Sequence, residues 1–119
     1  SAVREPSMPE TPRELTIPEI HTLVEQFGDC AKRAKAAGFD AVEVHGAHGY
    51  LAGAFASPFS NKRSDEYGGT IRNRARFGME IIRNIKKNAE KTIRCCIGSL
   101  LWNMCRAGWV SKSQRSSQG

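Results

Sequence analysis

The chain has 119 residues, enough for one domain with a modest core, and a formal net charge of +6. It contains no run of about 18 apolar residues, so no membrane-spanning helix is predicted. The charge suggests a nucleic-acid partner, but residues 93–119 hold four basic residues and no acidic one. The rest of the chain is nearly balanced, which argues against a nucleic-acid-binding surface there. The four cysteines show no CxxC spacing, which indicates free thiols and a cytoplasmic location.

Residues 1–15 contain three prolines and no periodic apolar face, which predicts an extended connector. A helix is predicted to begin at Thr16, because Thr16 and Glu19 have the spacing of a capping box and Pro18 lies in the first turn. Gly38 is placed to end this helix in a left-handed conformation. The apolar stripe of the helix is expected to consist of Ile20, Leu23, Val24, Phe27, Ala31 and Ala34.

A short strand is predicted from Phe39 to His45. Val42 and Val44 would face one side of it, and Glu43 and His45 the other. This alternation fits a half-exposed strand, and it equally fits a barrel strand with one face toward helices and one toward the barrel interior. In a barrel, functional groups collect at the C-terminal ends of the strands, where His45 lies. The order of helix, strand, loop and helix predicts an α/β fold.

Residues 51–70 begin as an apolar turn that Pro58 would end, and continue as a loop rich in Ser, Asn, Asp, Gly and charged residues. A loop of this composition is expected to be solvated. A second helix is predicted to begin between Thr70 and Asn73. Its apolar stripe is expected to consist of Ile71, Ala75, Met79, Ile82 and Ile85.

The stretch from Glu43 to Tyr50 gathers two histidines, a tyrosine and two glycines. His45 and His48 could hydrogen-bond a developing negative charge on a carbonyl oxygen, ligate a metal together with Glu43, or bond loop carbonyls in a structural role. Tyr50 keeps its proton at neutral pH and could deliver it to a carbanion-like centre. It could equally close the loop over the apolar residues that follow it. The residues alone leave these alternatives open.

Three segments closely resemble the old yellow enzyme family of FMN-dependent oxidoreductases. They read GFDAVEVHGAHGYL at residues 38–51, SPFSNKRSDEYGG at 57–69 and NRARF at 73–77. The resemblance extends over residues 12–92, and bacterial NADH:flavin oxidoreductases, enoate reductases and dienoyl-CoA reductases share these segments.

The resemblance implies a (β/α)8 TIM barrel with FMN at the C-terminal end of its strands and NADH or NADPH as the reductant. The reduced flavin would reduce the C=C bond of an activated alkene such as an enone, enoate or enoyl thioester. His45 and His48 would bind the carbonyl oxygen of this substrate, and Tyr50 would donate the proton opposite the flavin hydride. The resemblance assigns no metal, and it makes the loop at residues 61–69 a structural support for the site.

The chain departs from the family pattern after residue 92, since Arg94–Trp102 does not look like the next barrel strand. We therefore expect a partial TIM-barrel domain at residues 16–92, a fragment of the whole barrel. Residues 93–119 are expected to form a divergent, partly disordered tail. A small activated alkene is the expected partner, with no nucleic acid and no membrane. The alternative to a flavoenzyme is an inactive α-β-α unit that binds no flavin.

Overall fold

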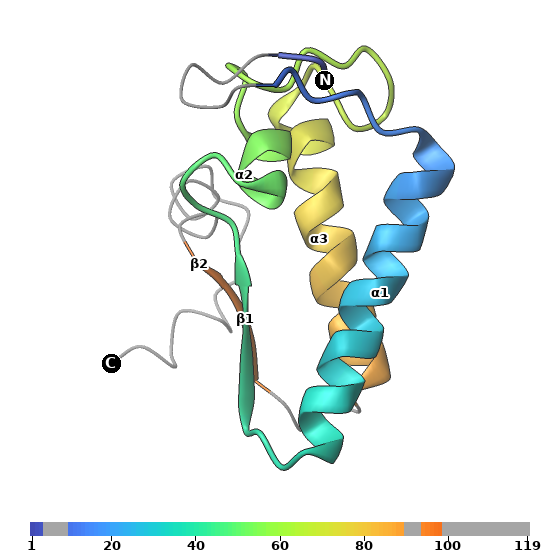
Figure 1. The fold of residues 1–119 in the computed structure, drawn as a ribbon, viewed down its shortest axis with the longest axis vertical. Helices are drawn as coiled ribbons and strands as arrows, with labels where there is room; N and C mark the ends of the chain where they lie inside the picture. Colours follow the sequence, from blue (N-terminus) through green and yellow to red (C-terminus); the bar gives the residue numbers. More distant parts are fainter. Residues whose placement is uncertain (4–9, 90–93, 99–119) are drawn as a thin grey trace.

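The computed structural model describes residues 1–3, 10–89 and 94–98, which form a two-stranded sheet packed against two long helices (Figure 1). The two long helices run in one direction and the strands run in the opposite direction, so each strand returns along the helix that precedes it. The elements in chain order are α1 (Ile17–Ala36), β1 (Ala41–His45), α2 (Leu51–Ala56), α3 (Ile71–Asn88) and β2 (Arg94–Gly98). None of the helices in these described segments is both long and apolar enough to cross a lipid bilayer.

Helix α1 begins and ends where the sequence predicts. Thr16 is its N-cap, and the Thr16 and Glu19 side chains each bond the backbone N–H of the other residue. The chain leaves the helix through Gly38, whose φ of +87° is a left-handed conformation that glycine adopts without a steric penalty. The expected stripe is confirmed, because its members are buried or pack against the core.

Strand β1 has the alternation that its sequence predicts. Val44 is buried and Val42 is half-buried, and both pack against the hydrophobic core, whereas Glu43 and His45 are exposed on the opposite face of the sheet. The helices therefore cover one face of β1 and leave the face that carries His45 open. The largest fully buried side chains of the core are Tyr67, Phe77, Ile20, Ile81, Ile85 and Ile97.

Helix α3 begins after its N-cap Thr70, as predicted, but the expected apolar stripe is partly wrong. Ile71 is 49% exposed, whereas Phe77 and Ile81, which the stripe omitted, are completely buried. Helix α3 contacts α1, α2 and β2, so its buried arc is wider than the single stripe that a helix with one partner would need. Ile71 is the first residue of the helix.

Strand β2 corrects the expectation that residues 94–102 do not form the next strand. Arg94–Gly98 pairs in parallel with Ala41–His45, and the Arg94 N–H donates to the Asp40 carbonyl at 3.0 Å. Backbone pairing accepts almost any residue, and Ile97, which is 2% exposed, supplies the apolar contact with the helices. The sheet thus continues past the boundary expected at residue 92. The rest of the expected tail, residues 99–119, lies outside the described residues.

Candidate active site

The candidate site occupies the C-terminal end of β1 and the short loop between β1 and α2. His45 is the last residue of β1, and the alternation of the strand places it on the open face. In α/β proteins with parallel strands, ligands bind at this end of the sheet. The structure therefore places His45 where the sequence predicts it, at the C-terminal end of the strand.

Two consecutive left-handed residues fold the loop back over His45. His48 has a φ of +55° and Gly49 a φ of +74°, and the Tyr50 N–H donates to the Ala47 carbonyl at 3.2 Å. A left-handed conformation is uncommon for any residue other than glycine, and such residues cluster at functional sites. His48 is the only non-glycine residue with a positive φ in the described segments.

This turn brings the three predicted site residues together. The ring centroid of His45 lies 5.2 Å from that of His48 and 5.1 Å from that of Tyr50, and both pairs are tilted by about half a right angle. All three side chains are exposed, and none has a hydrogen-bond partner among the described residues. Three polar donors thus stand side by side with their hydrogen-bonding capacity unused.

The alternative roles are less well supported by the geometry. Tyr50 is 57% exposed and lies against His45, so it does not close the loop as a half-buried core residue. No group of three His, Cys, Asp or Glu side chains within the described segments could hold a metal ion. The exposed arrangement leaves the donors of the three side chains accessible from outside the chain.

The loop at residues 60–69 differs from the solvated loop that its composition predicts. Asn61 is buried, and its amide nitrogen donates to the carbonyls of Phe55 at 2.6 Å and Tyr67 at 2.8 Å. Its side-chain oxygen accepts from the Arg63 N–H. One amide side chain thus joins the end of α2 to both arms of the loop.

Arg63 is the second buried polar residue, and its guanidinium joins the loop to the start of α1. It forms a two-point contact with the Asp65 carboxylate, at 3.0 and 2.5 Å, and donates to the Leu15 carbonyl at 2.7 Å. Its second acidic neighbour is Glu14, at 3.4 Å. The hydrogen bond to Asp65 raises the pKa of Arg63 and lowers the pKa of that carboxyl, so both groups stay charged.

Tyr67 fills the space under the same loop. Its ring packs edge-on against Phe55, and its hydroxyl donates to Glu80 at 2.8 Å. Burial, followed by the hydrogen bond to Glu80, raises its pKa. Gly68 is required next to it, because a Cβ there would collide with the Arg63 carbonyl. The charged loop is therefore a buried support beneath α2, and its expected solvation is wrong at Asn61, Arg63 and Tyr67.

A signal for this burial was present in the sequence. Asn61, Arg63, Asp65 and Tyr67 occupy alternate positions, which is the spacing of an extended segment with one side turned inward. The polarity of these residues concealed the pattern, because buried arginine and asparagine are uncommon without partners.

Comparison with protein families identifies the chain. Residues 2–104 match the model of the NADH:flavin oxidoreductase / NADH oxidase family. The chain belongs to this family. Membership confirms the resemblance to the old yellow enzymes.

Three relatives are similar in sequence to part of this chain. The chain is 58% identical over 76 residues to an NADH oxidase of Thermoanaerobacter brockii. The matched segment makes up 64% of this chain and 12% of that protein. It is 53% identical over 78 residues to an NADPH dehydrogenase of Clostridium acetobutylicum, covering 66% and 23%. It is 45% identical over 103 residues to a cinnamate reductase of Clostridium sporogenes, covering 82% and 16%.

Solved structures of morphinone reductase share the fold. The structure of morphinone reductase in complex with tetrahydroNAD superposes with a TM-score of 0.69 at 43% identity, covering 74% of this chain and 24% of that one. Morphinone reductase is a TIM barrel, so the predicted fold class, part of a (β/α)8 barrel, is confirmed. The chain spans a quarter or less of the length of these relatives.

Proposed function

We propose that this chain carries the substrate-binding corner of an FMN-dependent NAD(P)H oxidoreductase that reduces activated C=C bonds. His45 and His48 bind the carbonyl oxygen of the substrate, and Tyr50 donates the proton. The observation that supports this proposal most directly is the close approach of the three rings, each exposed and without a hydrogen bond to the described residues.

The donor set suits a conjugated carbonyl compound. Hydrogen bonds from two imidazoles to the carbonyl oxygen withdraw electrons from the C=C bond and stabilise the negative charge that develops on oxygen. Removal of one such donor typically costs about 3–4 kcal/mol of transition-state stabilisation. The α-carbon then needs a proton, which the neighbouring Tyr50 hydroxyl can supply. Because Tyr50 is largely exposed, solvent can return that proton to the phenol.

The site also fits a flavin nearby, as judged from the chemistry of its donors. Two carbonyl-binding groups and a proton donor provide every step of alkene reduction except the hydride. FMN, when bound, supplies that hydride after reduction by NADH or NADPH. We assign none of the described residues to the flavin itself. The family, and the relatives that are named NADH oxidase and NADPH dehydrogenase, support this choice of cofactors.

The alternative is an α/β unit that binds no flavin by itself. The chain covers 24% of the morphinone reductase chain, and the described residues contain two strands of the sheet. A flavin held at the strand ends of a barrel contacts several strands, so two strands provide only part of such a site.

A flavin-binding measurement separates the two candidates. The purified chain is mixed with FMN, and unbound flavin is removed by gel filtration. Flavin absorbance that elutes in equal amount with the protein supports the enzyme, and its absence supports the flavin-free unit.

The half-reactions then test the residue roles. We expect Tyr50→Phe to slow the oxidation of reduced flavin by an enone about 100-fold or more, because it removes the proton donor. Reduction of the flavin by NADPH should be unchanged, since this step does not use the phenol. We expect His45→Ala and His48→Ala to weaken the binding of carbonyl ligands. An equal loss in both half-reactions of Tyr50→Phe would contradict its assignment as proton donor.

A further inference from the structure

A partly open cavity of about 840 Å³ is lined by the N-terminal connector, the loop at residues 46–49, α2 with the residues that follow it, and the start of α3. Its volume is within the usual range for small-molecule sites. The described residues that line it include three arginines and one histidine, and no aspartate or glutamate. The chemistry of the lining therefore disfavours a cationic ligand.

Two of the three arginines in the lining are already neutralised. Arg13 forms an ion pair with Glu19 at 2.5 Å, and Arg63 forms one with Asp65 at the same distance. Their charges are therefore matched within the protein.

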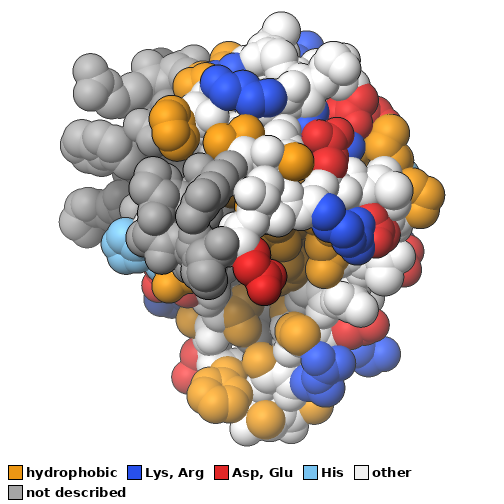
Figure 2. Space-filling view, turned by 45° about the horizontal axis from the view of Figure 1, so that its top comes forward, with side chains coloured by type: hydrophobic (Ala, Val, Ile, Leu, Met, Phe, Trp, Pro, Cys, Tyr) orange, Lys and Arg blue, Asp and Glu red, His pale blue; other side chains and the backbone are white. Residues whose placement is uncertain are grey.

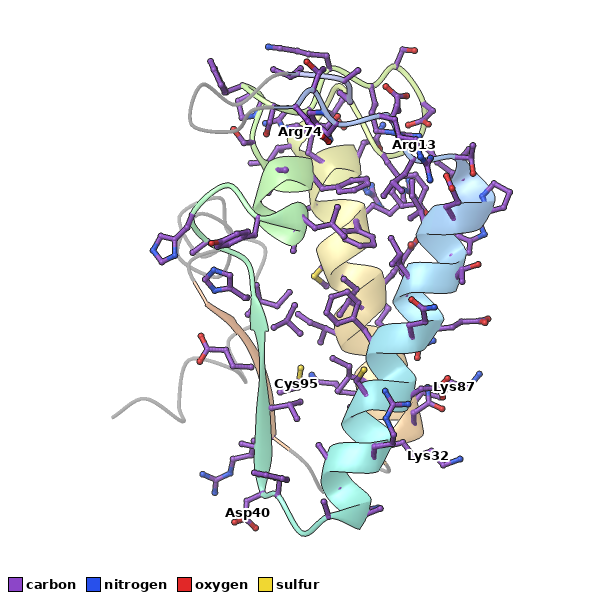
Figure 3. All side chains as sticks on the ribbon, in the orientation of Figure 1. Arg13, Lys32, Asp40, Arg74, Lys87 and Cys95 are labelled. Atoms are coloured by element: carbon purple, nitrogen blue, oxygen red, sulfur yellow. The ribbon has the colours of Figure 1, made fainter. Side chains whose placement is uncertain are left out.

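Arg74 differs from both. Its Nε donates to the Ala56 carbonyl at 3.0 Å and its Nη1 to the Gly69 carbonyl, so two backbone groups hold the guanidinium in place. Within the described part of the chain it has no carboxylate partner. Figure 3 shows Arg74 where α3 begins, next to α2. Arg74 thus presents a fixed and unmatched positive charge.

The remaining lining is mainly apolar. Leu51, Phe59 and Ile71 line the cavity and are 41%, 65% and 49% exposed, respectively, and Phe55 lies deeper. Figure 2 shows hydrophobic and basic side chains side by side at the end of the molecule that is turned toward the viewer. Large apolar side chains that are exposed around a cavity are typical of ligand-binding grooves.

From these observations we propose that the cavity binds an organic monocarboxylate with an apolar tail. The carboxylate pairs with the guanidinium of Arg74, and the tail lies against Phe59, Leu51 and Ile71. A guanidinium matches the planar geometry of a carboxylate and binds it through charge-assisted hydrogen bonds. A monoanion balances the single unmatched charge. This site needs neither the flavin nor the proton donor of the proposed reaction.

The test uses decanoate as the probe and decanol as its uncharged counterpart. Both are titrated into the 119-residue chain by calorimetry, after circular dichroism has shown that the chain is helical. We expect decanoate to bind at one site per chain and more tightly than decanol. Added salt should weaken the binding of decanoate more than the binding of decanol, because only decanoate binds through a charge.

Three variants locate the site. Arg74→Gln should weaken decanoate about tenfold or more and leave decanol unchanged, since a charge-assisted hydrogen bond is about twice as strong as a neutral one. Arg83→Gln removes the same charge from an exposed position of α3 outside the cavity and should change neither affinity. Phe59→Ser, at an exposed position, should weaken both probes.

Three outcomes would overturn the proposal. Equal affinities for decanoate and decanol would remove the role of charge, and equal losses in Arg74→Gln and Arg83→Gln would remove the role of Arg74. A chain without helical signal would show that the cavity does not form in solution. Retention of binding by Arg74→Lys, together with its loss in Arg74→Gln, would support the proposal, because lysine keeps the charge.

Discussion

Two polar loops flank α2, and they differ in whether their polar side chains are buried and hydrogen-bonded. In the loop at residues 60–69, Asn61 and Arg63 are buried and bonded to carbonyls and carboxylates of the chain itself. In the loop at residues 46–50, the side chains of His48 and Tyr50 are exposed and bond to none of the described residues. The first loop uses its donors to hold the fold, whereas the donors of the second remain available to a ligand.

This difference shows how polar composition can mislead. Composition alone would assign both loops to solvent, although Asn61, Arg63 and Tyr67 in the loop at residues 60–69 are buried. A buried polar group is stabilised when its partners are in place and costs free energy when one is lost. An exposed donor has little effect on stability and can form a hydrogen bond with a ligand. The comparison therefore predicts large stability effects in one loop and functional effects in the other.

The largest effect is expected for Arg63→Leu, which leaves Asp65 and the Leu15 carbonyl without their partner. We expect the free energy of unfolding to fall by about 2 kcal/mol, because a partly buried carboxylate and a carbonyl lose the guanidinium that they share. Urea denaturation followed by circular dichroism measures this change. Lys62→Ala, at the exposed neighbour, is the control and should stay within about 0.5 kcal/mol of the wild type. A similar loss in both variants would show that burial of Arg63 does not matter.

A smaller effect on stability, together with a loss of ligand binding, is expected at His48, whose φ is positive. His48→Gly should be more stable than His48→Ala by about 1 kcal/mol, because glycine tolerates this conformation and alanine does not. Both variants remove the imidazole, so both should lose affinity for carbonyl ligands to the same extent. Thermal unfolding and ligand titration on the same two samples separate these quantities. Equal stability of the two variants would show that the loop is not strained in solution.

The smallest effect concerns the pH dependence of the helix that begins at Thr16. The hydrogen bond from Arg13, with those from Thr16, lowers the pKa of the Glu19 carboxyl from 4.5 to about 2. The unfolded chain therefore takes up this proton first as the pH falls, and the stabilisation present above pH 4.5 is lost between 4.5 and 2. Glu19→Gln should flatten stability over this range in an acid titration. An unchanged titration would rule out Glu19 as a source of acid sensitivity.

Local chemistry made much of this structure predictable. The capping pair Thr16 and Glu19, the left-handed Gly38 and the alternation of β1 each depend on residues close together in the sequence. The clustering of His45, His48 and Tyr50 also lies within one turn. Physical rules that act over a few residues are sufficient for such features.

The remaining features depend on partners far apart in the chain. Arg63 is buried because Leu15, 48 residues earlier, supplies an acceptor. The face of α3 that is buried depends on three separate neighbours, and β2 forms because β1 offers it an open edge. The local sequence does not distinguish Arg74 from the other arginines, because the cavity beside it is lined by segments that lie far apart in the chain. Long-range pairing of this kind leaves little trace in local periodicity.

The alternation of β1 has a consequence for how this protein can change. Val42 and Val44 pack against the core from one side of the strand, and Glu43 and His45 are exposed on the other side. A substitution at one position alters one contact, whereas the deletion of a single residue within the strand exchanges the two sides. Glu43 or His45 would then point into the core, and a valine would point away from it. A deletion or insertion within this strand is therefore expected to be more damaging than a substitution at any single position.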